Sequence, residues 1–105
     1  MYRRIKKNSE FTRMFTRGKR IFSPALIVLF LPGDKLSLGV CVSKKHGKSV
    51  KRNRIKRLLR EAFRHVATDS LRGAFILIPK QAEEYSLAAF EKSLRGALKR
   101  EKLLR

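Results

Sequence analysis

The segment SKKHGKSVKRNRIKRLLREAFR, residues 43–64, passes from the end of a short strand through a basic loop into a long amphipathic helix. Eight of the fourteen residues 44–57 are Lys or Arg, and none is Asp or Glu. The start of a helix carries partial positive charge, so cations there are disfavoured. A sequence shaped only by folding would place acids at this position. We therefore expect an anion from outside the chain to compensate these charges.

The helix after this loop has one apolar face and one basic face. Ser49 is its predicted N-cap. The apolar residues recur at helical spacing and predict a stripe buried on a sheet, namely Ile55, Leu58, Leu59, Ala62, Phe63 and Val66. The opposite face carries Asn53, Lys56, Arg57, Arg60 and Arg64. At about 100° per residue, Arg52 and Arg54 point toward opposite edges of the stripe, so one helix could hold two phosphates.

The loop itself is suited to phosphate binding. Gly47 allows a close approach of the backbone, and the free N–H groups at the helix start lie among the basic residues 48–51. The alternative is an ordinary solvated charge run. The absence of any acid from Lys35 to Arg60 favours an anion site.

Two strands are predicted upstream of the loop. Residues 21–31 are mainly apolar, with Pro24 near an edge or the beginning, and the turn at 32–34 predicts antiparallel pairing with the next strand. That strand, residues 36–43, alternates between large apolar and small residues. We expect its small face to be lightly covered, open as a shallow floor for a ligand, or simply exposed; this face comprises Ser37, Gly39, Cys41 and Ser43.

Three further elements complete the order. Asn8 or Ser9 is predicted to cap a helix that ends at Gly18 in a left-handed conformation. Residues 74–78, opened by Gly73, are apolar on both faces and predict a central strand. The last helix begins after a cap at Ser86, and its apolar side comprises Leu87, Phe90, Leu94, Ala97 and Leu98.

The predicted fold class is α/β, an α+β two-layer sandwich in the order α-β-β-α-β-α with a small mixed sheet. The 105 residues are enough for one domain, residues 1–105. The two strands that flank the long helix could be parallel. General rules predict a right-handed crossover between them, because about 98% of such units have that hand.

Composition limits the classes of partner. The chain has 27 Lys or Arg against 8 Asp or Glu, a net charge of +19, and 43% hydrophobic residues. A globular domain so basic is attracted to polyanions, either nucleic acid or an acidic membrane surface. The longest apolar run, residues 25–31, is too short to span a membrane, and residues 1–20 do not form a signal peptide. One cysteine, Cys41, excludes an internal disulfide framework, so we expect a cytoplasmic protein.

A protein active site is not evident. His46 and His65 are predicted to be surface or loop histidines, because no acidic residue is evidently placed to orient either. Cys41 is expected to be a small packed side chain. Glu83 and Glu84 are adjacent in sequence, and such neighbours rarely converge on one substrate atom. The sequence contains no phosphate-binding glycine loop, zinc spacing or nucleophile elbow. We predict no catalytic residue and no metal ligand in this chain.

The first helix offers a second nucleic-acid element. Phe11, Met14 and Phe15 form an apolar stripe, with Arg13 and Arg17 off that stripe. Aromatic rings beside cations are a common way to hold single-stranded nucleic acid. The alternative is that both rings belong to the core. Both descriptions could be partly true if the rings form the wall of a groove.

Two segments resemble the bacterial ribonuclease P protein subunit. These are SKKHGKSVKRNRIKRLLREAFR and NSEFTRMFTRGKR, residues 8–20, and the order of elements is similar along nearly the whole chain. The resemblance implies a protein that assembles 1:1 with a large catalytic RNA and removes 5′ leaders from precursor tRNA. It also implies that the RNA and its Mg²⁺ ions hydrolyse the phosphodiester, that the protein lowers the Mg²⁺ requirement and firmly binds no cofactor, and that the crossover is left-handed.

Site residues follow from the same resemblance. Contact with the catalytic RNA is implied for Lys44, Lys45, Lys48, Lys51, Arg52, Asn53, Arg54, Lys56, Arg57 and Arg60. Contact with the precursor tRNA leader is implied for Phe11, Phe15, Arg13 and Arg17, together with the strand face around residues 37–43. His46 stands where the family often has a branched apolar residue, which raises the idea of a pH-sensitive RNA contact, and Ser49 where Ala is usual.

The same composition supports rival functions. A ribosomal or other structural RNA-binding protein would bind RNA without changing a cleavage rate. A protein nuclease would cut precursor tRNA without an added RNA. A double-stranded DNA binder is less consistent with the sequence, because no base-reading helix with a dimerising partner is evident.

Overall fold

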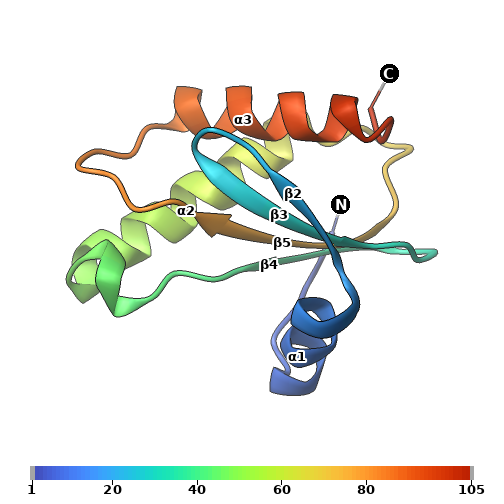
Figure 1. The fold of residues 1–105 in the computed structure, drawn as a ribbon, viewed down its shortest axis with the longest axis horizontal. Coiled ribbons are helices and arrows are strands. Elements are labelled where there is room, and N and C mark those ends of the chain that lie inside the picture. The colour runs from blue at the N-terminus through green and yellow to red at the C-terminus, as the bar shows by residue number, and fades with distance from the viewer. Residues whose placement is uncertain (1, 105) are drawn as a thin grey trace.

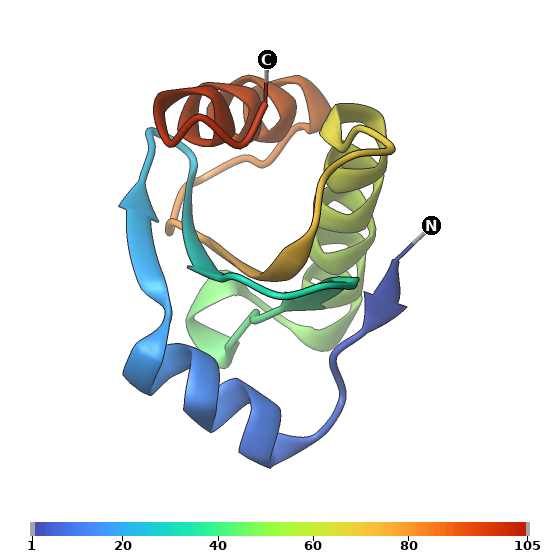
Figure 2. The same cartoon turned by 90° about the vertical axis from the view of Figure 1, so that its right-hand side faces the viewer.

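A five-stranded mixed sheet forms the centre of the computed structural model, which describes residues 2–104 (Figure 1). The elements are β1 (Arg3–Arg4), α1 (Asn8–Arg17), β2 (Lys19–Phe22), β3 (Leu26–Leu31), β4 (Leu36–Val40), the 3₁₀ helix η1 (Lys44–His46), α2 (Ser49–Val66), β5 (Gly73–Pro79) and α3 (Leu87–Arg100). Helices α2 and α3 cover one face of the sheet, and α1 lies against the other (Figure 2). The predicted fold class and order are confirmed, with β1 added and the first predicted strand divided into β2 and β3.

The strand order is β1-β4-β5-β3-β2, with β5 in the centre as predicted. Strand β5 is parallel to β4 and antiparallel to β3. The prediction that β3 and β4 pair across the turn at residues 32–34 is wrong, because β5 lies between them. Phe75, Ile76 and Leu77 of β5 are fully buried, which explains why this strand takes the central position. The antiparallel partner of β3 is instead β2, which precedes it.

The β4-α2-β5 crossover is left-handed, as the family resemblance implies, and the general expectation of a right-handed unit is wrong (Figures 1 and 2). The pattern of β4 gives the physical reason. Its large residues Leu36, Leu38 and Val40 face the core beneath α2, whereas Gly39 faces α1. A right-handed crossover would place α2 over the small-residue face, where its apolar stripe would find no large partners.

The main core lies between the sheet and the helices α2 and α3. The predicted stripe of α2 is confirmed, since Ile55, Leu59, Ala62, Phe63 and Val66 are buried there. Leu58 is half-buried at the edge of the same core. Burying one large apolar side chain contributes about 1.5–3 kcal/mol, so this stripe holds the helix firmly on the sheet.

A second, smaller core lies beneath α1. Met14, Ile5, Leu29 and Ile76 are buried in it, and Phe11 packs at its side. A Cβ atom at Gly39 would lie 3.1 Å from the Phe11 ring, so the glycine permits the close approach of α1. Half of the small-residue face of β4 is therefore covered rather than open.

The predicted ends of α1 are wrong in detail. The helix begins at Asn8 itself, and the carbonyl of Lys7 accepts the first main-chain hydrogen bonds, so neither Asn8 nor Ser9 acts as the cap. Gly18 has φ −68°, which is not left-handed. A Cβ atom at Gly18 would lie 2.5 Å from the carbonyl oxygen of Met14, so close backbone approach explains the glycine.

Candidate nucleic-acid interface

The basic loop is a short 3₁₀ helix that turns sharply into α2. Gly47 joins them with φ +123°, a conformation that side chains rarely adopt. Lys48 occupies the N-cap position of α2 without a side-chain hydrogen bond, so the prediction that Ser49 is the cap is wrong: Ser49 is already the first helical residue. The first turn contains no acidic residue. The N–H groups there consequently have neither a capping side chain nor a compensating carboxylate.

His46 fixes this loop to the sheet. Of the predicted alternatives, a surface or a loop histidine, the loop position is confirmed and the surface position is wrong, because only 3% of His46 is exposed. Its Nε2–H donates to the carbonyl of Pro79 at 2.8 Å, and its Nδ1 accepts from the N–H of Ser43 at 3.0 Å. Both ring nitrogens are thus used within the protein. His46 positions the basic loop, and its buried ring lies away from the exposed surface where a pH-sensitive contact with RNA would form.

The ten residues assigned to catalytic RNA lie on η1, the following turn and the first three turns of α2. Seven are exposed, namely Lys44, Lys45, Lys48, Lys51, Asn53, Arg54 and Arg57. Three are half-buried, namely Arg52, Lys56 and Arg60. None of the nine cations forms an ion pair with a carboxylate of residues 2–104. The surface therefore has strong uncompensated positive charge.

Two arginines on this surface lie in unusual surroundings. The Nε of Arg52 is buried and has no hydrogen-bond partner among the described residues. Burial lowers the pKa of Arg60, and the nearby cation Arg4 lowers it further. Groups of this kind gain from an added anion, because it would supply the missing acceptor and reduce the repulsion.

The face of α1 assigned to the leader is partly open. Arg13 and Arg17 are exposed, and 36% of Phe15 is exposed. Phe11 packs instead against the second core and the Gly39 backbone. Of the two alternatives for these rings, a place in the core fits Phe11 and an exposed position fits Phe15. Phe11 forms the wall beside the sheet, and Phe15 presents a ring surface.

A row of half-exposed apolar residues crosses the sheet beyond the end of α1. Phe22 pairs with Ile27, which pairs with Ile78, and the N–H of Cys41 bonds to the carbonyl next to Ile78. Phe22 is 58% exposed, the largest exposure of an aromatic residue in the described part of the chain. By contrast, Ser37 is 5% exposed. The open floor thus lies at the Cys41 end of β4, and the earlier part of the face around residues 37–43 is covered.

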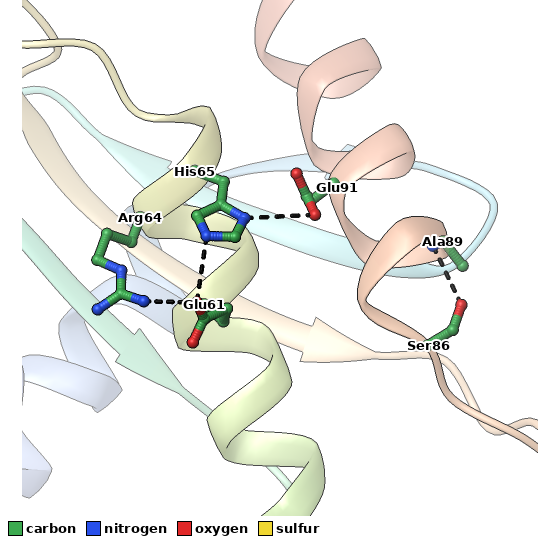
Figure 3. Close-up of polar contacts among 6 residues, drawn as sticks. All are labelled: Glu61, Arg64, His65, Ser86, Ala89 and Glu91. Atoms are coloured by element: carbon green, nitrogen blue, oxygen red, sulfur yellow. Dashed lines mark hydrogen bonds and ion pairs between the residues drawn. The ribbon is translucent and has the colours of Figure 1, made fainter.

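His65 lies outside this surface and joins α2 to α3 (Figure 3). The expectation that no acid orients it is wrong, because its Nε2 lies 3.1 Å from Glu61 and its Nδ1 lies 3.5 Å from Glu91. Glu61 also binds Arg64. Glu61 lies four residues before His65 on α2, a spacing that places the two side chains together on a helix. Glu91 comes from α3, and the sequence alone did not indicate that contact. On α3 the predicted cap is confirmed, since Ser86 accepts the N–H of Ala89 at 3.2 Å (Figure 3).

Comparison with known proteins identifies the family. A family model described as Ribonuclease P matches residues 2–102. The Ribonuclease P protein component of Staphylococcus carnosus (strain TM300) is 39% identical over 104 residues, which cover 95% of this chain and 90% of that protein. This chain belongs to the ribonuclease P protein family. The family's member from Shouchella clausii (strain KSM-K16) is 38% identical over 107 residues, covering 96% of this chain and 87% of that one.

Solved structures of ribonuclease P proteins share the fold. The RNase P protein of Staphylococcus aureus superposes with a TM-score of 0.84 at 33% identity, covering 100% of both chains. The protein from Thermotoga maritima superposes with a TM-score of 0.77 at 30% identity, covering 92% of this chain and 96% of that one. The resemblance to the ribonuclease P protein subunit and the predicted fold class are thus confirmed.

The ribonuclease P fold of this chain also contains candidate residues that sequence reasoning missed. Phe22 was included only in a mainly apolar strand, and its pairing with Ile27 reveals that it faces the α1 side. Arg3 and Arg4 form an additional edge strand, and Arg4 adds charge beside Arg60. Arg3 and Arg4 stand together between Tyr2 and Ile5, so the segment has no period-two alternation that would have indicated this strand.

No group of three or more His, Cys, Asp or Glu side chains in residues 2–104 is arranged to hold a metal ion. No helix in the same range is long and apolar enough to cross a membrane.

Proposed function

We propose that this chain is the protein subunit of a ribonuclease P that removes the 5′ leader from precursor tRNA in the cytoplasm, with the catalytic centre in a partner RNA. One observation carries the proposal. This chain belongs to the ribonuclease P protein family and presents nine cations on η1, the following turn and α2. None of these cations pairs with a carboxylate of the described residues. Such a surface is suited to a large folded polyanion.

The basic face of α2 is the proposed contact with the catalytic RNA. Binding there releases counterions from the RNA, so affinity falls by about 0.7–0.9 log units per log unit of salt for each phosphate neutralised. The apolar stripe fixes α2 on the sheet, and His46 fixes η1 through its two hydrogen bonds. The cations are therefore held on a rigid scaffold before RNA arrives, which reduces the entropy lost on binding.

The surface formed by α1 and the open end of the sheet is the proposed leader site. Phe15 and Phe22 present exposed rings, and Arg13 and Arg17 lie on the same helix as Phe15. Unpaired bases stack on aromatic rings with little regard to sequence. A leader of variable sequence is the kind of ligand that such a surface accepts.

The protein then contributes to cleavage indirectly. It adds binding free energy for the leader-bearing substrate, and its positive charge screens the repulsion between the catalytic RNA and precursor tRNA. Less Mg²⁺ is then needed to screen the same repulsion. The Mg²⁺ ions that act in the reaction belong, in this proposal, to the RNA.

A reconstitution experiment tests the proposal against its rivals. Precursor tRNA is incubated at low Mg²⁺ with the protein, with the catalytic RNA, or with both at a 1:1 ratio. We expect cleavage at the 5′ leader only when both are present. Cleavage by the protein alone would identify a protein nuclease. Binding of RNA without faster cleavage would identify a structural RNA-binding protein.

A further inference from the structure

We propose that the cavity at the C-terminal end of α2 binds one unpaired nucleotide of an RNA strand, a site separate from both surfaces described above. The proposal rests on the RNA partner proposed for this chain. The cavity has a volume of about 580 Å³, within the range of small-ligand sites. It lies between β1, the start of β4 and the connection from α2 to β5, at the end of the sheet that faces the viewer in Figure 2.

The cationic side of the cavity is suited to a phosphate. Lys35 and Arg72 line it, and neither pairs with a carboxylate of residues 2–104. Nη1 of Arg72 donates to the main-chain carbonyls of Asp69 at 2.6 Å and Leu71 at 2.8 Å. These bonds fix the guanidinium plane while its other N–H groups stay available to a ligand. Arg fixed in this way can bind a phosphate with two parallel hydrogen bonds.

The other side of the cavity is suited to a base. The Tyr2 ring lines it and packs edge-on against Phe63, with 5.7 Å between ring centroids. This packing holds the ring in one orientation, so it can stack on a base without first becoming ordered. Asp34 and Asp69 also line the cavity, and neither forms an ion pair among the described residues.

The mixture of charges distinguishes a nucleotide from a free anion. Two carboxylates would repel inorganic phosphate, but they can accept hydrogen bonds from the amino and ring N–H groups of a base. Arg3 and Arg64 also line the cavity, although each is already bound to a glutamate, Arg3 to Glu10 and Arg64 to Glu61. A ligand with one phosphate and one donor-bearing ring matches both sides of the cavity.

The cavity adjoins the far end of the basic face of α2, where Arg64 lines it. Lys56, Arg60 and Arg64 follow one another at intervals of four residues and therefore lie along one side of the helix. The 18 residues of α2 span about 27 Å, from the basic loop to the cavity. Arg4 adds charge beside Arg60 on this path. An RNA strand that follows the helix axis reaches the cavity at its far end.

Charge-matched variants test the site. Lys35→Glu with Arg72→Glu alters the cavity, whereas Lys92→Glu with Arg95→Glu makes the same change in net charge on the exposed side of α3. Dissociation constants are measured for the catalytic RNA alone and for precursor tRNA bound to the reconstituted complex. We expect the cavity variant to weaken one of them at least tenfold and the control less than threefold. The affected RNA identifies which strand supplies the nucleotide; equal losses in the two variants would overturn the proposal.

Two further variants distinguish loss of the cavity site from unfolding of the protein and from failure of the proposed function. Because Arg72 also bonds to the backbone, Lys35→Glu alone is measured beside the double variant, with folding checked by circular dichroism. Arg52→Ala with Arg54→Ala is run in parallel. If that variant loses RNA affinity while both cavity variants keep it, only the cavity inference fails. If none loses affinity, the proposed function fails as well.

The base is tested separately with the free protein. Amide shifts near Lys35 and Arg72 are followed by NMR during titration with AMP, with UMP and with inorganic phosphate. We expect both nucleotides to bind at least fivefold more tightly than phosphate, and Tyr2→Leu to remove that difference while keeping the packing on Phe63. Equal affinity for phosphate and nucleotides would show a site for phosphate only and would contradict the proposed nucleotide site.

Discussion

Replacing two arginines of α2, Arg52 and Arg54, provides a quantitative test of the RNA interface. Arg52 and Arg54 lie two residues apart on the helix, about 200° around its axis, so they cannot share one phosphate. Replacing both with Ala should remove two phosphate contacts. The salt dependence of log K should then become shallower by about 1.4–1.8, at 0.7–0.9 for each phosphate. Extrapolated from 1 M to 0.15 M salt, this corresponds to about 15- to 30-fold weaker binding of the catalytic RNA.

The fold should tolerate this double change. Neither arginine forms an ion pair with the described residues, Ala is the best helix former, and the Nε of Arg52 is a buried donor without a partner. We expect the free energy of unfolding to change by less than about 1 kcal/mol. The assay is fluorescence anisotropy of labelled catalytic RNA at four salt concentrations, with Lys92→Ala plus Arg95→Ala as the charge-matched control. An unchanged salt slope in the folded variant would refute the assignment of this face.

Three other predictions concern α1 and the proposed leader site. Phe15→Ala should weaken binding of leader-bearing precursor by about 1–3 kcal/mol and leave mature tRNA unaffected, measured with matched RNAs; an equal loss for both would remove this ring from the leader site. Gly39→Val should lower the midpoint of urea unfolding, because its Cβ would meet the Phe11 ring at 3.1 Å. Gly96→Val is the control: it has open space around it inside α3, and Val is a better helix former than Gly, so the midpoint should stay the same or rise. The hydrogen bond from Arg3 lowers the pKa of Glu10, so this ion pair should add a small amount to the stability of the fold above pH 4.5. The added stability should disappear as the pH falls through the depressed pKa of Glu10. Glu10→Gln should flatten this part of the plot of unfolding free energy against pH, and an identical plot would contradict the ion pair.

Local sequence patterns predicted the elements well because each pattern has one dominant physical cause. The apolar stripe of α2 is buried, and the alternation in β4 separates two faces. The doubly apolar β5 lies in the centre. Hydrophobic periodicity determines all three, so no knowledge of distant residues was needed.

The errors arose where distant segments compete for the same partner. The turn at residues 32–34 predicted a hairpin, but β5 pairs with both flanking strands and displaces that pairing. The burial of His46 was missed because its acceptor, the Pro79 carbonyl, is 33 residues away. The caps predicted at Asn8, Ser9 and Ser49 failed because both helices begin earlier than the patterns indicated. Lys7 and Lys48 occupy the N-cap positions, and their carbonyls accept the first helical hydrogen bonds without a side-chain cap.

The site was only partly predictable for the same reason. Basic residues at a helix start indicate an anion site without any tertiary information, because the helix dipole acts within one turn. The exposure of Phe22 and the covering of Ser37 depend on where α1 packs, which no local pattern encodes. The cavity beside Tyr2 assembles from four segments spread between residues 2 and 72, so it has no sequence motif at all.

The unfavourable charges of α2 persist because the opposite side of the same helix stabilises it. A cation in the first turn costs about 0.3–1 kcal/mol through the helix dipole, and Lys51 and Arg52 both lie there. Against this, Ile55, Leu59 and Phe63 are buried at 0–1% exposure, and each contributes about 1.5–3 kcal/mol. The burial outweighs the repulsion, so the basic face can remain uncompensated in the free protein. The repulsion is then relieved when RNA binds, which adds to the affinity for a polyanion without any change in the fold.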